Sequence, residues 1–165
     1  MNLWYVIQTK PKKETEATSY LSMKGLEVFN PLMETFHSKN GKIDKALKSL
    51  FPNYIFARFD LNQSYSLVRW ARGVKKVLGY GEYPIPVSNN VINLIRQRTD
   101  GNGVVRKTCH FDHNDLIRIK LGPLKELLGI FDRWVSDGER VRVLLNLVGY
   151  QPVVELHYSS LEKVA

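Results

Sequence analysis

Few residues of this 165-residue chain combine the types and the spacing that catalysis or metal binding requires. His110 and His113 are three positions apart, but no thiolate pair and no carboxylate at ligand spacing completes a metal site. Cys109 is the only cysteine, and the sequence places no activating group beside its thiol. A Gly-x-Gly-x-x-Gly loop and a P-loop are both absent. We therefore expect no enzyme, no metal site and no cofactor, and interpret the two histidines as linker residues.

The side chains best suited to binding lie between Leu50 and Phe59. Five large apolar or aromatic groups follow Leu50 in this stretch, namely Phe51, Tyr54, Ile55, Phe56 and Phe59. Pro52-Asn53 is a turn signal, so a strand is predicted from Tyr54 to Asp60. Side chains alternate across a strand and therefore divide into two sets. One set is Tyr54, Phe56 and Arg58, and the other is Ile55, Ala57 and Phe59. One face can be core, and an aromatic pair beside an arginine is a mixture common at binding surfaces.

The net charge of +8 is concentrated in the first part of the chain. Residues 1–100 hold 15 lysines and arginines against 8 acidic residues, whereas residues 101–165 hold 9 against 8. A basic first part suits nucleic acid or an acidic protein surface, although scattered lysines are also usual on a solvated surface. The contrast suggests two domains with different partners.

The composition also excludes several classes of protein. With 44% hydrophobic and 24% charged residues, the chain suits a globular protein of one domain or two small ones. No apolar run approaches the roughly 20 residues that span a bilayer, and the first ten residues lack the basic start of a signal peptide. A single cysteine argues for a reducing compartment. We expect a cytoplasmic protein with no membrane partner.

The first 98 residues are predicted to form an α+β unit, an antiparallel sheet with helices packed on it. Strands are expected at residues 3–9, 26–31, 54–60 and 74–80, and helices at residues 10–22, 64–71 and 88–98. Pro11 suits the first turn of the first helix, Gly25 its end, and Ser88 the cap of the third helix. Residues 35–49 contain the tight-turn pair Asn40-Gly41 and are predicted to be an exposed, mobile basic hairpin or loop.

The run from Thr99 to Gly103 is the clearest break, so residues 99–110 are predicted to be a flexible linker. Strand-like segments separated by turns follow at residues 116–120, 128–134, 140–147 and 153–158. They predict a small, partly open β-barrel at residues 111–165.

A helical hairpin is the alternative for this second part. An apolar stripe at helical spacing supports it and consists of Leu124, Leu127, Leu128 and Phe131. Gly129, Gly149 and Pro152 oppose long helices and favour the barrel.

Two sets of motifs resemble the NusG family. The first set, Trp4-Tyr5-Val6 and Phe51-Pro52-Asn53-Tyr54-Ile55-Phe56, is similar to the amino-terminal (NGN) domain of NusG-type transcription factors. The second set is similar to the KOW domain that follows it: Gly122-Pro123-Leu124-Lys125, Gly129, Arg140-Val141-Arg142-Val143 and Val154-Glu155-Leu156. Asn53 and the segment Ala71-Arg72-Gly73-Val74 look more like the specialised RfaH-type paralogues than housekeeping NusG. The resemblance implies an NGN domain at 1–98, the linker at 99–110 and a KOW domain at 111–165.

The resemblance implies a bacterial elongation and antitermination factor that binds RNA polymerase and suppresses pausing and termination. In the family, an apolar depression docks on the clamp helices of the polymerase, and the matching positions are Tyr54, Phe56, Tyr80, Ile92 and Ile95. Without the resemblance, core would be the better interpretation of both aromatics. Both isoleucines could equally be core, because one face of their helix must be buried. Ser64, Tyr65 and Ser66 match a hydroxyl-rich patch that touches the opposite polymerase lobe, and Ser64 equally suits a helix N-cap.

The resemblance also implies contacts beyond the clamp helices. Residues proposed to bind the non-template DNA strand are Lys10, Lys13, Tyr20, Arg69, Arg72, Gly73 and Lys75. Tyr20 and Trp70 are the candidates for base stacking. In the second domain, Leu147, Val148 and Tyr150 lie at the turn that in the family contacts the ribosomal protein NusE or the terminator Rho.

Other functions remain as alternatives to an RfaH-like factor. The chain could be a housekeeping NusG-type factor, or a ribosomal or general RNA-binding KOW protein. An RNA binder has no need for an apolar docking face beside its basic patch, so the aromatic strand separates the last class from the first two. We expect the protein to be a monomer.

Overall fold

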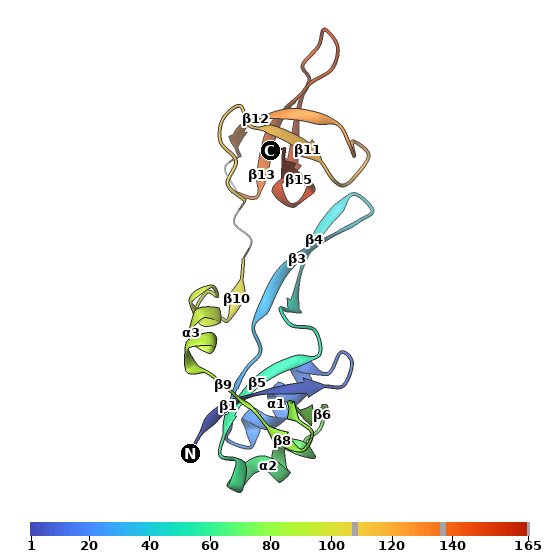
Figure 1. The fold of residues 1–165 in the computed structure, drawn as a ribbon. Coiled ribbons are helices and arrows are strands. Elements are labelled where there is room, and N and C mark those ends of the chain that lie inside the picture. Colours follow the sequence, from blue (N-terminus) through green and yellow to red (C-terminus); the bar gives the residue numbers. More distant parts are fainter. Residues whose placement is uncertain (107–108, 136–137, 165) are drawn as a thin grey trace. The chain divides into compact units, whose positions relative to one another are not determined.

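The computed structural model describes residues 1–106, 109–135 and 138–164, which form two compact units. Unit 1 contains residues 1–35 and 47–106, and unit 2 contains residues 36–46 with the described residues from Cys109 onward. Each unit has its own sheet and its own hydrophobic core (Figure 1). The α+β fold class predicted from the sequence is confirmed.

Unit 1 contains the helices α1 (Glu14–Met23), α2 (Leu61–Arg69) and α3 (Asn89–Gln97). Its strands are β1 (Leu3–Thr9), β2 (Glu27–Phe29), β5 (Tyr54–Phe59), β6 (Val74–Val77), β7 (Gly79–Tyr80), β8 (Tyr83–Pro84), β9 (Pro86–Val87) and β10 (Val104–Val105). The strands β3 (Leu32–Lys39) and β4 (Lys42–Ser49) lie partly in each unit.

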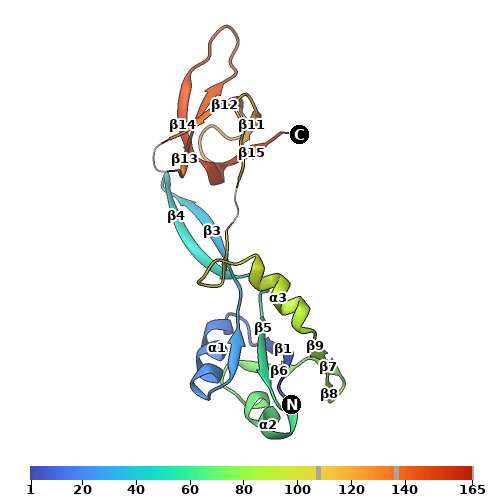
Figure 2. The same ribbon diagram turned by 90° about the vertical axis from the view of Figure 1, so that its left-hand side faces the viewer.

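The main sheet of unit 1 has the order β2-β5-β1-β6, and β9 also pairs with β1. All its pairings are antiparallel. The predicted alternation along β5 is confirmed, because Ile55, Ala57 and Phe59 belong to one core and Phe56 to another. α1 and α2 contribute to the first core, whereas α3 covers the opposite face (Figure 2). The sheet is therefore buried on both faces.

Capping residues explain where the helices begin. α1 begins at Glu14 instead of the predicted Lys10, because Lys12 has a positive φ of 60° and cannot belong to a helix. α2 begins at Leu61 instead of Ser64, because the Asp60 carboxylate accepts a hydrogen bond from the Asn62 amide at 2.9 Å. The predicted cap of α3 is confirmed: the Ser88 hydroxyl accepts from the Asn90 amide at 3.2 Å.

Residues 35–49 form a hairpin, the first of the two predicted alternatives. Asn40 and Gly41 both have positive φ, as a two-residue turn of this kind requires. Within unit 1, β10 pairs in parallel with the start of β3, so part of the segment predicted to be a flexible linker is a strand. Arg106 directly follows β10, and its guanidinium donates to the carboxylate of Glu34 in β3 at 3.1 Å.

Unit 2 contains β11 (Leu116–Ile119), β12 (Leu128–Trp134), β13 (Arg140–Leu145), β14 (Val153–His157), a short 3-10 helix (Tyr158–Ser160) and β15 (Leu161–Lys163). They form an antiparallel sheet in the order β14-β13-β12-β11-β15 around one core. The helical hairpin alternative is wrong for this structure. Gly129 shows why a strand fits, because a Cβ there would lie 2.4 Å from Val143 Cγ1 of the neighbouring strand.

Candidate binding surfaces

The five residues predicted to form a docking depression lie on or near the α3 side of the sheet, but not all of them face solvent. Phe56 is 7% exposed and Ile92 is fully buried, in a cluster with Trp4 and Phe29. Phe56, which the resemblance implied would line the docking depression, is instead a core residue, because Ile92 of α3 packs in the same cluster. Tyr54 and Ile95 are half-buried, and Tyr80 is 81% exposed.

Several aromatic side chains in the same unit remain accessible, and one of them contacts this buried cluster. Phe51 is partly exposed and packs edge-on against Phe56, with ring centroids 5.7 Å apart. Tyr80 pairs across the β7–β8 turn with Tyr83, and both are largely exposed. Sequence reasoning missed Tyr83, although its position across a short turn from Tyr80 was a visible signal. We call Phe51, Tyr54, Tyr80 and Tyr83 the aromatic margin.

Arg96 connects α3 to the sheet. Its guanidinium donates to the Glu27 carboxylate at 2.9 Å and lies over the rings of Trp4 and Phe29, 5.1 and 5.2 Å from their centroids. Arg58 lies 3.5 Å from the same carboxylate. The hydrogen bond from Arg96, with a smaller contribution from Arg58, holds the pKa of Glu27 below its ordinary value. The charged face of α3 thus contributes to holding its apolar residues against the sheet.

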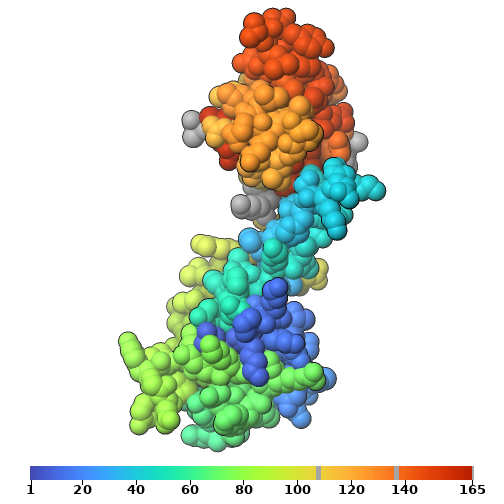
Figure 3. Space-filling model, turned by 90° about the vertical axis from the view of Figure 1, so that its right-hand side faces the viewer, coloured from blue at the N-terminus to red at the C-terminus, as the bar shows by residue number. Residues whose placement is uncertain are grey.

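Three of the predicted DNA-binding residues meet at a second site, at the end of α2. A pocket of about 230 Å³ is lined by Lys10, Arg69, Trp70, Ala71, Val74 and Lys75, and we call it the Trp70 pocket. Lys10 reaches it because its amide donates to the Gly73 carbonyl at 2.8 Å. In Figure 3 the dark-blue start of the chain lies beside the green segment that contains α2 and β6.

The other predicted DNA-binding residues have different surroundings. Lys13 and Arg72 both pair with the Glu16 carboxylate, at 2.8 and 2.5 Å, and lower its pKa, Lys13 more strongly. Tyr20 is partly buried against the core of unit 1. At Gly73, φ is +82° and a Cβ would lie 3.2 Å from the Lys13 carbonyl, so this glycine permits the close approach of the two segments.

The predicted hydroxyl-rich patch lies within α2. Ser64 is half-buried in the helix and is not its cap, since Asp60 occupies that position. Tyr65 packs against the core of unit 1, and Ser66 is exposed. Ser66 is therefore the most accessible member of this patch.

Leu147, Val148 and Tyr150 occupy an exposed turn of unit 2. Leu147 and Tyr150 exchange backbone hydrogen bonds of 3.2 and 3.1 Å, and Gly149 between them has a φ of +70°. Val148 is completely exposed and Tyr150 is 67% exposed. The turn therefore presents apolar side chains on a fixed backbone.

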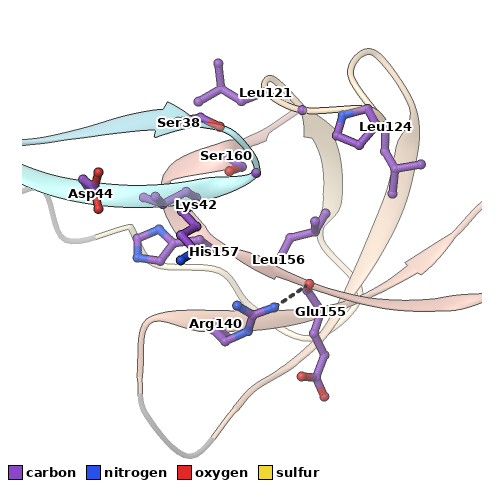
Figure 4. A pocket seen from close by; sticks show the side chains of 14 residues that line it. Ser38, Lys42, Asp44, Leu121, Leu124, Arg140, Glu155, Leu156, His157 and Ser160 are labelled. Carbon is purple, nitrogen blue, oxygen red and sulfur yellow. Dashed lines mark hydrogen bonds between the residues drawn. The ribbon is translucent and has the colours of Figure 1, made fainter.

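Unit 2 also contains an open pocket of about 490 Å³ (Figure 4). Its wall includes residues of the hairpin, such as Lys42 and Asp44, and residues of the sheet, such as Arg140 and His157. The Arg140 guanidinium donates to the Glu155 carbonyl at 3.1 Å. Charged groups of both signs line this pocket, and their arrangement indicates no particular ligand.

A protein-family model described as "Transcription termination factor nusG" matches residues 2–96, which include all of the aromatic margin and the Trp70 pocket. The chain belongs to the NusG family. The NusG transcription termination/antitermination protein of Campylobacter jejuni is 25% identical over 171 residues, covering 98% of this chain and 97% of that protein. That of Thermus thermophilus is 26% identical over 179 residues, covering 97% of each chain.

The comparisons also bear on fold and activity. The crystal structure of the MjSpt4:Spt5 complex in conformation A matches with a TM-score of 0.54 and 11% identity, covering 99% of both chains, which supports the fold. As a member of the NusG family, the chain is a transcription termination/antitermination factor and not an enzyme, and the family interacts with RNA polymerase. In the part of the chain that the structure describes, no helix is long and apolar enough to cross a membrane.

Proposed function

We propose that this chain is a specialised, RfaH-like member of the NusG family that binds the polymerase clamp helices and suppresses pausing and termination in the bacterial cytoplasm. Residues 1–98 would form the polymerase-binding domain, residues 99–110 the connection and residues 111–165 the KOW domain. The observation that carries the proposal is the aromatic margin, whose member Phe51 packs against the buried Phe56 cluster. Exposed aromatic groups around a rigid apolar base are typical of a protein-binding hot spot.

The burial of Phe56 and Ile92 divides the proposed roles within this surface. These two side chains would support the surface from below, while Tyr54 and Tyr80 would contact the clamp helices and Ile95 would contribute at the edge. A factor bound across the polymerase cleft would favour the closed clamp over the paused state, because a ligand shifts an equilibrium toward the state that it binds better. Ser66, with its neighbours Ser64 and Tyr65, is proposed to touch the opposite lobe.

The Trp70 pocket is proposed to contact the non-template DNA strand exposed in the elongation complex. Within the described residues, neither Lys10 nor Lys75 forms an ion pair, so both charges are available to phosphate. Lys13, Arg72, Gly73 and Tyr20 would extend this contact along α1. In unit 2, the turn at Leu147, Val148 and Tyr150 is proposed to bind NusE.

The alternative is a housekeeping factor that binds Rho through the same turn. The relatives named above favour it, because they carry the name NusG and share about a quarter of their residues with this chain. The residues that favour the RfaH-like branch are Asn53 and the Ala71–Val74 segment.

Single-round transcription with a bacterial polymerase, on a template that contains a pause site and a Rho-dependent terminator, tests the proposal. We expect the full chain to shorten the pause and to increase read-through when Rho is present. Increased termination with Rho would identify the housekeeping alternative. Unchanged pausing and termination at saturating protein would contradict both.

A further inference from the structure

We infer that unit 2 associates with a second copy of this chain through an apolar row on the outer face of its sheet. The row takes one residue from each of four neighbouring strands, β11 to β14, and consists of Leu116, Ile130, Leu144 and Val153. We call it the outer row. The inference is independent of the proposed polymerase and DNA contacts, and it replaces the monomer expected from the sequence by a dimer.

The strand register places the four side chains of the outer row next to one another. The paired positions across the sheet are Leu116 with Ile130, Ile130 with Leu144, and Leu144 with Val153. Adjacent residues along the strands, such as Ile117 and Val143, belong to the core of unit 2. Because side chains alternate across a strand, the outer row lies on the face opposite to this core.

The outer row is accessible to a partner. Leu116 is 39% exposed and Val153 is 46% exposed, while Ile130 and Leu144 are half-buried. Among the described residues, none of the four belongs to a hydrophobic cluster. The outer face of an antiparallel sheet that covers a core is ordinarily polar, so an apolar row across four strands indicates a surface that a partner covers.

The outer row is complementary to itself. A two-fold axis parallel to the strands, midway between β12 and β13, would lay β12 of one copy on β13 of the other. Ile130 would then meet Leu144, and Leu116 would meet Val153, so that every contact joins two aliphatic side chains. Two sheets packed face to face in this way have the arrangement of a β-sandwich, and a two-fold interface uses the same surface of both copies.

The charges beside the outer row do not oppose a second copy. On one side lie two acidic and two basic residues, namely Asp132, Arg133, Arg142 and Glu155. Asp132 and Arg142 are 3.3 Å apart, and on the other side of the row the Arg118 guanidinium donates to the Glu162 carboxylate at 3.1 Å. A balanced rim around an apolar centre suits two identical protein surfaces, whereas nucleic acid would require an excess of basic residues.

Sedimentation equilibrium of the full chain, at protein concentrations from about 1 to about 200 µM, tests the inference. We expect the average molecular mass to rise with concentration from that of a monomer toward that of a dimer. Val153→Lys should weaken the dimer at least about tenfold, because it places one charge from each copy in an apolar contact. In the wild-type chain, the amide NMR shifts that change with concentration should be those of β11 to β14.

Leu121→Lys is the matched control, because Leu121 is 41% exposed in the same unit but lies outside the outer row. This variant should dimerise like the wild type. A chain that stays monomeric over the whole range would overturn the inference, as would unchanged association in a folded Val153→Lys variant. If that variant does not fold, concentration-dependent shifts outside β11 to β14 would overturn it instead. A monomeric chain that loses binding to purified NusE in Val153→Lys would assign the outer row to NusE and exclude the second copy.

Discussion

Replacing Arg96 by alanine should loosen α3 from the sheet. The substitution removes an ion pair with Glu27 whose two side chains are 41% and 45% exposed, and such a pair contributes about 0.2–1 kcal/mol. It also removes two cation–π contacts, to Trp4 and Phe29, each worth about 0.5–1 kcal/mol at partly exposed sites. Since one guanidinium makes all three contacts, they are not independent, and we expect a total loss of about 1–2 kcal/mol.

Hydrogen exchange of the α3 amides measures this loss directly, because it reports local opening without requiring the two units to unfold together. A loss of about 1–2 kcal/mol corresponds to roughly 5- to 30-fold faster exchange in α3 if exchange follows local opening. Arg98→Ala is the control, since Arg98 is at the same end of α3 and forms no ion pair within the described residues. Arg96→Lys should give an intermediate rate, because lysine keeps the charge but not the planar group.

Equal exchange rates in Arg96→Ala and Arg98→Ala would contradict a role of the Arg96 contacts in holding α3 against the sheet. Faster exchange spread evenly over the whole of unit 1 would also contradict it, because the contacts of Arg96 are confined to α3, β1 and β2.

Three further predictions concern stability. Gly129→Ala should destabilise unit 2 by about 1–3 kcal/mol in urea denaturation, because the new Cβ meets the buried Val143; an unchanged midpoint would contradict this. Asp60→Ala should lower the free energy of unfolding by about 1 kcal/mol in thermal denaturation, because it removes the cap of α2. Asp60→Asn should keep most of this stability, and equal losses in the two variants would contradict the capping role. Because its pKa is lowered in the folded state, Glu27 contributes stability above its unfolded pKa of about 4.3. The difference in unfolding free energy between wild type and Glu27→Gln should therefore close as pH falls through the folded pKa. A difference that stays constant with pH would contradict this.

Sequence patterns located the strands and helices better than they located the surfaces. Alternation along β5 correctly separated Ile55 from Phe56, because a period of two is a local property of a strand. The burial of Phe56 could not be predicted in the same way, since it depends on α3, which follows about thirty residues later and covers the second face of the sheet. A helix that is half apolar on its own does not say what its apolar side covers.

The Trp70 pocket illustrates the same limit for charged residues. Lys10 and Lys75 were both recognised as basic candidates, but the pairing of β1 with β6 and the hydrogen bond from Lys10 to Gly73 are what bring the two segments together. The short strand β10 was missed because its two valines follow a glycine-rich turn, and its pairing with β3 is a tertiary contact. Such two-residue pairings leave no periodic signal in a sequence.

Binding of the full chain to a purified polymerase clamp-helix fragment measures whether the aromatic margin docks on RNA polymerase. The variant Tyr54→Ala/Tyr80→Ala changes one half-buried and one exposed side chain, whereas Phe56→Ala would damage a buried cluster. We expect the double variant to bind at least about tenfold more weakly, while Met23→Ala, which changes an exposed side chain at the end of α1, binds like the wild type. Unchanged affinity in a double variant that keeps its fold would contradict the proposal that the aromatic margin docks on RNA polymerase.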